Sequence, residues 1–277
     1  MKSFDAISTI NSKNANLGKK IPKFMYPIIR KILAEKQVNK LFNDAKGRSG
    51  LELVKWILED LDITVKVQKP ANFDPKEKMV YCANHPTGGI DGIVLISVLA
   101  DLHPDIILPV NDLLISLPGL GEFFFPLNMY ADNRQRLRQI DSLYQSDRTI
   151  AIFPSGKTAR LKDGVVTDLP WTKSFLKKAR LSKRAITPIH LSGRNSKRFY
   201  RIWKLRTFFG IKINFEMFLL IDELFRLRGS EISVVIGNPV SLAELPVDDT
   251  KAVPLLKKLT EDLGNKDNKY DNSDRAS

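Results

Sequence analysis

The hydrophobic positions of this chain change their spacing along its length. From residue 22 to residue 60, apolar residues recur three or four positions apart, the period of an amphipathic helix, with a break at residues 47–50. This pattern predicts a pair of helices at the N-terminal end. From residue 63, apolar and polar residues alternate, which is typical of a half-buried strand.

Short apolar runs then alternate with amphipathic segments as far as residue 263. The expected strands are 63–67, 79–83, 106–110, 149–153, 186–190 and 232–236, and the expected helices are 92–100, 134–145, 172–181 and one within 252–263. Such alternation predicts an α/β fold with a mixed central sheet flanked by helices. The expected divisions are a helical segment at 1–60, a main domain at 61–263 and a polar, disordered tail at 264–277.

Three of the connecting loops directly follow an expected strand, at residues 84–91, 154–160 and 191–194. The ligand site of an open α/β sheet lies outside the carboxyl ends of its strands. We therefore expect these loops to lie together and to form one site.

The first loop reads Asn-His-Pro-Thr-Gly-Gly-Ile-Asp and contains one of only three histidines in the chain. Its glycines and proline predict a tight loop that can fold Asp91 back toward His85. A histidine oriented by a carboxylate is a candidate general base. The structural alternative is that Asp91 caps the next helix and that His85 is an ordinary loop residue.

The second loop contains Gly156-Lys157-Thr158, which resembles part of a phosphate-binding loop. The full motif needs a glycine five positions earlier, where Ala151 stands, so the match fails. Lys157 and Arg160 remain available for anions, and the alternative is a surface turn with solvated charges.

The net charge of the chain limits the classes of partner that we expect. The net charge is +13 and the sequence pI is about 9.7, which favours acidic partners. Residues 169–215 hold thirteen Lys/Arg with interleaved aromatics and no Asp/Glu, a composition suited to a membrane interface or a nucleic acid. Residues 1–60 are also basic, so their first helix suits either the membrane interface or the domain core. No apolar run approaches the length of a membrane span, about 18 residues.

Three sequence blocks together resemble a known family. Asn84–Gly92 matches Asn-His-Pro-x-Gly-Gly-x-Asp/Glu-Gly, Phe153–Gly156 matches Phe-Pro-x-Gly, and Pro188–Ser196 matches Pro-x-His-x-x-Gly-Arg-Asn-Ser. In this order and spacing they resemble the glycerophospholipid acyltransferase superfamily, most closely its bacterial hemolysin-like or ornithine-lipid-type branch. The resemblance covers residues 60–240.

The resemblance implies an acyltransferase with His85 as general base and Asp91 as its partner. The acyl donor is expected to be a thioester of acyl carrier protein or coenzyme A, and the acceptor a hydroxyl or amine of a lyso-lipid or lipid precursor. Backbone N–H groups of the Gly88-Gly89 turn or of the next helix are expected to stabilise the oxyanion. No metal or cofactor is expected. The residues expected to bind substrate are Asn84, Gly88, Gly89, Ser155, Gly156, Lys157, Arg160, Arg134 and Arg194.

Two departures from the family pattern concern the acceptor. Ser155 stands where the Phe-Pro-x-Gly block usually has Glu. The block whose Arg helps to bind glycerol phosphate has no clear match, since Asn128 falls there with Arg134 nearby. Both differences argue against glycerol phosphate and leave an amino-acid-bearing lyso-lipid open.

We expect the protein to be cytoplasmic and peripheral on the inner face of the cell membrane, with an anionic membrane surface as a partner and no nucleic acid. Two alternatives remain open at this point. One is a basic nucleic-acid- or lipid-binding protein without catalysis. The other is a thioester or lipid hydrolase that uses the same His85 and Asp91 on water.

Overall fold

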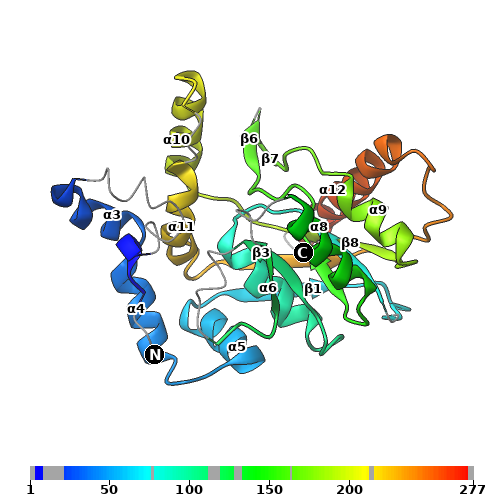
Figure 1. Cartoon of the computed structure of the whole chain (residues 1–277), viewed down its shortest axis with the longest axis horizontal. Coiled ribbons are helices and arrows are strands. Elements are labelled where there is room, and N and C mark those ends of the chain that lie inside the picture. The colour runs from blue at the N-terminus through cyan, green and yellow to red at the C-terminus, as the bar shows by residue number, and fades with distance from the viewer. Residues whose placement is uncertain are drawn as a thin grey trace.

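The computed structural model describes residues 4–8, 22–75, 78–111, 119–127, 133–162, 164–211 and 215–273. Helices surround a central sheet (Figure 1), whose strand order is β1-β9-β8-β2-β5. In that order the strands span Thr64–Gln68, Glu231–Ile236, Ile186–Leu191, Val80–Ala83 and Ile150–Ile152. β8 and β9 are antiparallel, and the other neighbouring strands are parallel. The predicted mixed α/β sheet is therefore confirmed.

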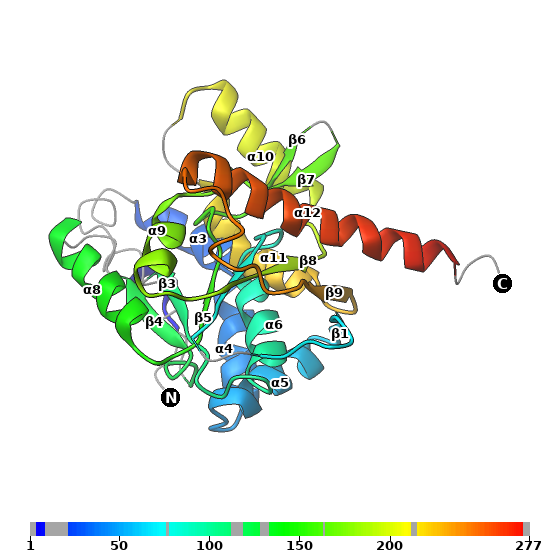
Figure 2. The same ribbon diagram turned by 90° about the vertical axis from the view of Figure 1, so that its right-hand side faces the viewer.

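Successive residues of β2 face opposite layers, as the two-residue period of a strand requires. Tyr81 and Ala83 join the core beneath α5 (Gly50–Asp60) and α6 (Gly89–Leu99). Val80 and Cys82 join a second core, which is covered by three helices on the other face. Those helices are α8 (Asn133–Gln145), α9 (Ser174–Leu181) and α12 (Asp249–Ser273). Figure 2 shows α12 and α6 on opposite sides of the strands. Burial on both faces explains why β2 reads as a continuous apolar run.

Several elements were not predicted from the periodicity. They are the strand β4 (Phe124–Leu127), which pairs with β3 (Leu108–Asn111), the hairpin β6 (Arg160–Lys162) and β7 (Val165–Thr167), and the helices α10 (Lys197–Phe208) and α11 (Leu220–Arg226). The strands are only three or four residues long, too short for a periodic signal. Helix α10 carries a mixture of basic and aromatic residues. From the sequence we interpreted this composition as a binding surface and predicted no helix there.

The first of the two predicted N-terminal helices is divided in the structure. A short 3-10 turn (Lys23–Met25) leads into α3 (Tyr26–Ile32), and α4 (Glu35–Asp44) follows after a turn. Ala34 turns the chain with a φ of 47°, a left-handed conformation unfavourable for alanine. The buried side chains of Leu33 and Ala6 pack together at this point and offset that cost. The break expected at residues 47–50 is present, since α5 begins at Gly50.

Two other findings concern the ends of the chain and the membrane. Helix α12 continues to Ser273, into the tail that was expected to be disordered. Within the described segments, no helix combines the length and hydropathy that a membrane span requires.

Candidate active site

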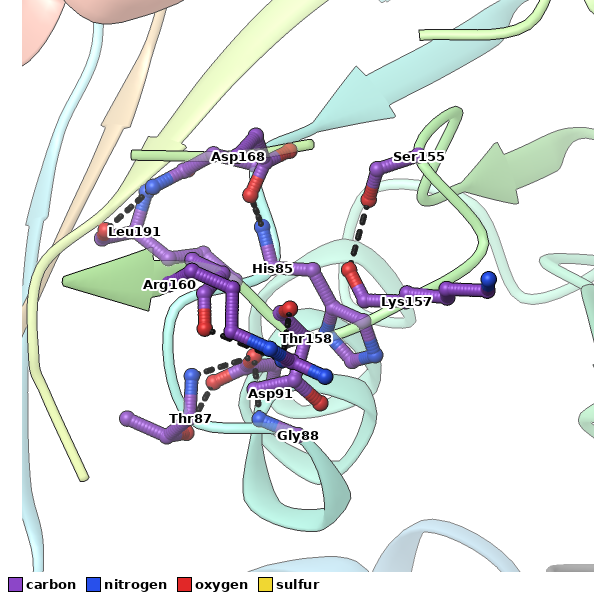
Figure 3. Close-up of polar contacts among 12 residues, drawn as sticks. His85, Thr87, Gly88, Asp91, Ser155, Lys157, Thr158, Arg160, Asp168 and Leu191 are labelled. Carbon is purple, nitrogen blue, oxygen red and sulfur yellow. Dashed lines mark hydrogen bonds and ion pairs between the residues drawn. The ribbon is translucent and has the colours of Figure 1, made fainter. Parts of the chain in front are cut away.

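The three predicted loops meet at the carboxyl edge of β2, β5 and β8 (Figure 3). The Asn84 side chain bridges to the neighbouring strand: its Nδ2 donates to the Leu191 carbonyl at 2.9 Å, and its Oδ1 accepts from the Leu191 N–H at 2.7 Å. On the other side, the N–H of Ala159 donates to the His85 carbonyl at 2.7 Å. The loops therefore form one hydrogen-bonded unit.

The imidazole of His85 lies against the carboxylate of Asp91. Nδ1 and Oδ2 are 2.8 Å apart, although the two residues lie six positions apart in the chain. Asp91 is buried, with 2 % of its side chain exposed. Its carboxylate also accepts from the backbone N–H groups of Thr87 and Gly88, at 3.0 and 2.9 Å, and from the Thr87 hydroxyl. The tight loop predicted between His85 and Asp91 is thus present.

Asp91 combines the two interpretations that the sequence left open. Helix α6 begins at Gly89, earlier than expected, so Asp91 is its third residue and not its N-cap. From there its carboxylate accepts the N–H of the N-cap residue Gly88, as in a capping box. The same oxygen accepts from His85. One buried carboxylate therefore begins the helix and also orients the imidazole.

Two further residues fix His85. Its backbone N–H donates to Oδ1 of Asp168 at 2.9 Å, and its ring stacks on Phe153 with centroids 4.0 Å apart. Asp168 also accepts from the indole of Trp171 at 2.9 Å. Burial raises the pKa of the Asp168 carboxyl above its usual value, against the effect of these hydrogen bonds. The sequence analysis missed Asp168, whose only signal was that the long basic stretch begins just after it.

The hydrogen bond to Asp91 determines which ring nitrogen of His85 can accept a proton. A carboxylate oxygen accepts, so Nδ1 donates, and the lone pair of the neutral ring is then on Nε2. No described residue forms a hydrogen bond with Nε2, and 17 % of the side chain is exposed. This arrangement suits a general base, which needs an oriented ring and an accessible nitrogen.

The second loop holds its predicted residues in two different environments. Gly156 and Lys157 are exposed, and the Ser155 hydroxyl donates to the Lys157 carbonyl at 2.8 Å. Arg160, in contrast, is 5 % exposed, and its guanidinium donates to Glu216 at 3.1 Å. The group that we expected to be available for anions is therefore engaged inside the protein.

The remaining predicted residues lie at differing places. Arg194 is exposed in the loop after β8. Arg134 is exposed at the start of α8. Asn128 lies outside the described residues.

Glycine is required at position 88 for two reasons. Its φ is 97°, and a Cβ there would lie 2.9 Å from Leu220 of α11 and 3.1 Å from the Thr158 hydroxyl. Helix α11 thus packs directly on the His85 loop, a contact that the sequence did not indicate. The Gly88 N–H is committed to Asp91, so it is engaged before any oxyanion forms. Gly89 is the first residue of α6.

Known proteins resemble this chain along most of its length. The model of a family described as "Acyltransferase" matches residues 8–268. A lyso-glycine lipid O-acyltransferase of Bacteroides thetaiotaomicron is 33% identical over 239 residues, covering 85% of this chain and 88% of the relative. A protein of the same name from Phocaeicola vulgatus is 30% identical over 238 residues, covering 85% of each.

Among solved structures, the 1-acyl-sn-glycerophosphate acyltransferase of Thermotoga maritima gives a TM-score of 0.49 at 14% identity, covering 88% of this chain and 92% of that one. The family model spans most of the chain, and the curated relatives match along nearly their whole length. The chain therefore belongs to this family of acyltransferases.

Proposed function

We propose that this enzyme transfers a fatty acyl group from a thioester to the hydroxyl of a lyso-lipid with an amino-acid head group, with His85 as the general base. The hydrogen bond of 2.8 Å between His85 Nδ1 and Asp91 carries the proposal, because it leaves Nε2 as the accessible proton acceptor. Both relatives are named lyso-glycine lipid O-acyltransferases, which supports a lyso-glycine lipid as the acceptor.

The reaction needs no covalent acyl-enzyme. His85 Nε2 removes the proton of the acceptor hydroxyl while its oxygen attacks the thioester carbonyl. Asp91 stabilises the imidazolium that forms. The tetrahedral intermediate then breaks its C–S bond, and the leaving sulfur takes the proton from Nε2. The products are an O-acyl ester and a free thiol, and His85 is neutral again.

Charge supports both proposed substrates. Acyl carrier protein and coenzyme A are acidic, and the chain carries a net charge of +13. A glycine head group ends in a carboxylate, and the exposed Lys157 and Arg194 lie in loops that border the site. We assign these two side chains to the anionic groups of the substrates. Ser155, in place of the usual Glu, fits an acceptor other than glycerol phosphate.

The test is a mass-spectrometric assay of the purified protein. Long-chain acyl carrier protein and acyl-coenzyme A are supplied in parallel, each with lyso-glycine lipid, lysophosphatidate or glycerol phosphate. We expect an O-acylated glycine lipid whose formation His85→Ala abolishes. A product that forms only from lysophosphatidate or glycerol phosphate would refute the acceptor.

A reaction without any acceptor separates acyl transfer from hydrolysis by the same His-Asp pair. Free fatty acid released as fast as the ester forms would favour the hydrolase. A product that survives His85→Ala would remove the catalytic role of His85.

A further inference from the structure

The end of helix α10 exposes two adjacent aromatic side chains. Phe208 and Phe209 are 83% and 64% exposed, and their rings stand edge to face with centroids 5.3 Å apart. Leu205 and Ile211 beside them are 59% and 41% exposed. Isolated exposed apolar residues are ordinary, but a contiguous group of them marks a contact surface.

The backbone of this tip is well defined. The N–H of Ile211 bonds to the Arg206 carbonyl at 3.0 Å, and that of Gly210 to the Thr207 carbonyl at 3.1 Å, with Gly210 at a φ of 64°. These two bonds form a Schellman motif, the usual end of an α-helix. The Arg206 side chain further holds the turn by donating to the Ile211 carbonyl at 2.7 Å. The aromatic rings are therefore presented by an ordered helix end.

Basic residues surround the apolar tip. Arg201 and Lys204 are exposed on the last turns of α10, and the helix contains no Asp or Glu. The thirteen Lys/Arg between Asp168 and Glu216 include those of α10. Aromatic side chains next to Lys and Arg are characteristic of elements that lie at the surface of an anionic bilayer. An acidic protein surface would match the charge but not the exposed aromatics.

The other end of α10 is joined to the candidate active site. Its N-cap, Ser196, lies two residues after Arg194, the end of the third loop. Ser196 donates to the buried Glu223 of α11 through its N–H and its hydroxyl. Helix α11 in turn packs on Gly88 through Leu220. The hairpin β6–β7 packs on this same end of α10 through Leu161 and Val166. Both views show α10 and the hairpin projecting on the same side (Figures 1 and 2).

We propose that the tip formed by Leu205, Phe208, Phe209 and Ile211 inserts into the interfacial layer of an anionic bilayer, with Arg201 and Lys204 on the lipid head groups. A helix of this length spans about 18 Å from its tip to the loops around His85. The contact holds the site at the membrane surface, where a lyso-lipid acceptor is found. The membrane contact stands independently, and only its role in bringing the site to the acceptor rests on the proposed acyl transfer.

Vesicle co-sedimentation of the full chain tests the contact without any reaction. The vesicles are phosphatidylcholine, alone or mixed with phosphatidylglycerol. We expect binding to the mixed vesicles, reduced about tenfold or more in the double variant Phe208→Ser/Phe209→Ser. The variant Arg201→Gln/Lys204→Gln should bind more weakly and with a shallower dependence on salt.

The matched control is Leu181→Ser/Val247→Ser. These side chains are 72% and 94% exposed and lie outside α10, so their loss should leave vesicle binding unchanged. Phe24→Ser/Ile28→Ser tests the exposed 3-10 turn and helix α3 near the N-terminus in the same assay. Binding of Phe208→Ser/Phe209→Ser equal to that of the unaltered protein would overturn the proposal, whatever α3 contributes.

An activity assay separates this inference from the proposed function. Phe208→Ser/Phe209→Ser should lose acyl transfer to a lyso-lipid in vesicles and keep transfer to a short-chain, water-soluble analogue. His85→Ala should lose both. If no protein transfers acyl groups while vesicle binding still depends on the two phenylalanines, the proposed function fails and the membrane contact stands. Equal loss on both acceptors would mean that the tip serves another partner, such as the acyl carrier protein, and would overturn the proposal.

Discussion

Two histidines lie at opposite edges of the same sheet and differ in one respect. His85 follows the carboxyl end of β2, and only its Nδ1 is held, by Asp91. His103 lies at the other edge, where α6 has returned the chain. Its Nε2 is 2.8 Å from the Tyr81 hydroxyl and its Nδ1 is 3.2 Å from the Thr149 hydroxyl. His85 keeps one accessible nitrogen, whereas His103 has both nitrogens engaged.

The difference shows that a polar partner alone does not mark a catalytic histidine. Both rings are oriented by a hydrogen bond, but a base also needs a second nitrogen that a substrate can reach. The carboxyl edge of the sheet provides that access, since its loops surround the ligand site of such folds. The buried amino edge does not. The predictions that follow use this contrast between His85 and His103.

The largest effect is expected from His85→Ala. The acyl-transfer rate should fall by about 10²–10⁴, the usual contribution of a general base. Stability should change little, because the ring is partly exposed and its loss removes only one hydrogen bond and the stacking on Phe153, while Asp91 keeps its other donors. Turnover is measured by mass spectrometry and stability by urea unfolding. A loss of stability with an unchanged rate would place His85 in the same class as His103.

Asp91→Asn should lower both quantities. The amide resembles the carboxylate in shape, but its NH₂ group would face the N–H groups of Thr87 and Gly88 or the ring of His85. We expect a rate loss of about 10²-fold, together with about 1–3 kcal/mol of stability. Asp91→Asn should lose both rate and stability, whereas His85→Ala should lose mainly rate. This difference tests the double role of Asp91. Retention of full stability would show that its capping bonds contribute little.

Gly88→Ala should distort the His85 loop on the side that contacts α11. Alanine at a φ of 97° costs about 1–3 kcal/mol, and its Cβ would contact Leu220 at 2.9 Å. The double variant Gly88→Ala/Leu220→Ala relieves the contact but not the backbone strain. We therefore expect partial recovery of activity relative to Gly88→Ala alone, after correction for Leu220→Ala. If activity does not recover, the whole loss in Gly88→Ala comes from backbone strain.

His103→Phe should behave in the opposite way to His85→Ala. It leaves the buried hydroxyls of Tyr81 and Thr149 without their partner, which costs about 1–3 kcal/mol of stability. The acyl-transfer rate of the folded variant should be unchanged, because His103 does not touch the site. A large fall in rate at unchanged fold would contradict the contrast between the two histidines.

The smallest effect concerns pH. Burial lowers the pKa of His103 below its usual value of 6.5. Below pH 6.5 the unfolded chain therefore binds a proton that the folded protein does not, so stability should fall as the pH decreases toward the folded pKa. Urea unfolding between pH 7 and pH 5 would measure this, with His103→Phe as the control that lacks the contribution. An identical pH dependence in both proteins would exclude His103 as its source.

Local patterns predicted much of this molecule. The alternation of apolar runs with amphipathic segments predicted the strands β1, β2, β5, β8 and β9 and the layers that cover them. The glycines around His85 predicted the loop that returns Asp91 to the ring. The three sequence blocks predicted the family. Each of these signals lies within a few neighbouring residues, and short-range sterics and the burial of alternate positions are enough to produce it.

Other features depend on which distant segments pack together. Asp168 lies 83 positions from His85 in the chain, and Arg160 lies 56 positions from Glu216. No local period distinguishes a buried arginine from a solvated one, or a carboxylate that holds a backbone N–H from an exposed one. The contact of α11 with Gly88 and the exposure of Phe208 also depend on how distant segments pack. The sequence by itself determined the strands of the central sheet, the His-Asp pair and the family. Tertiary structure decided which charges are buried and which aromatic residues face outward, because burial is a property of the packed chain.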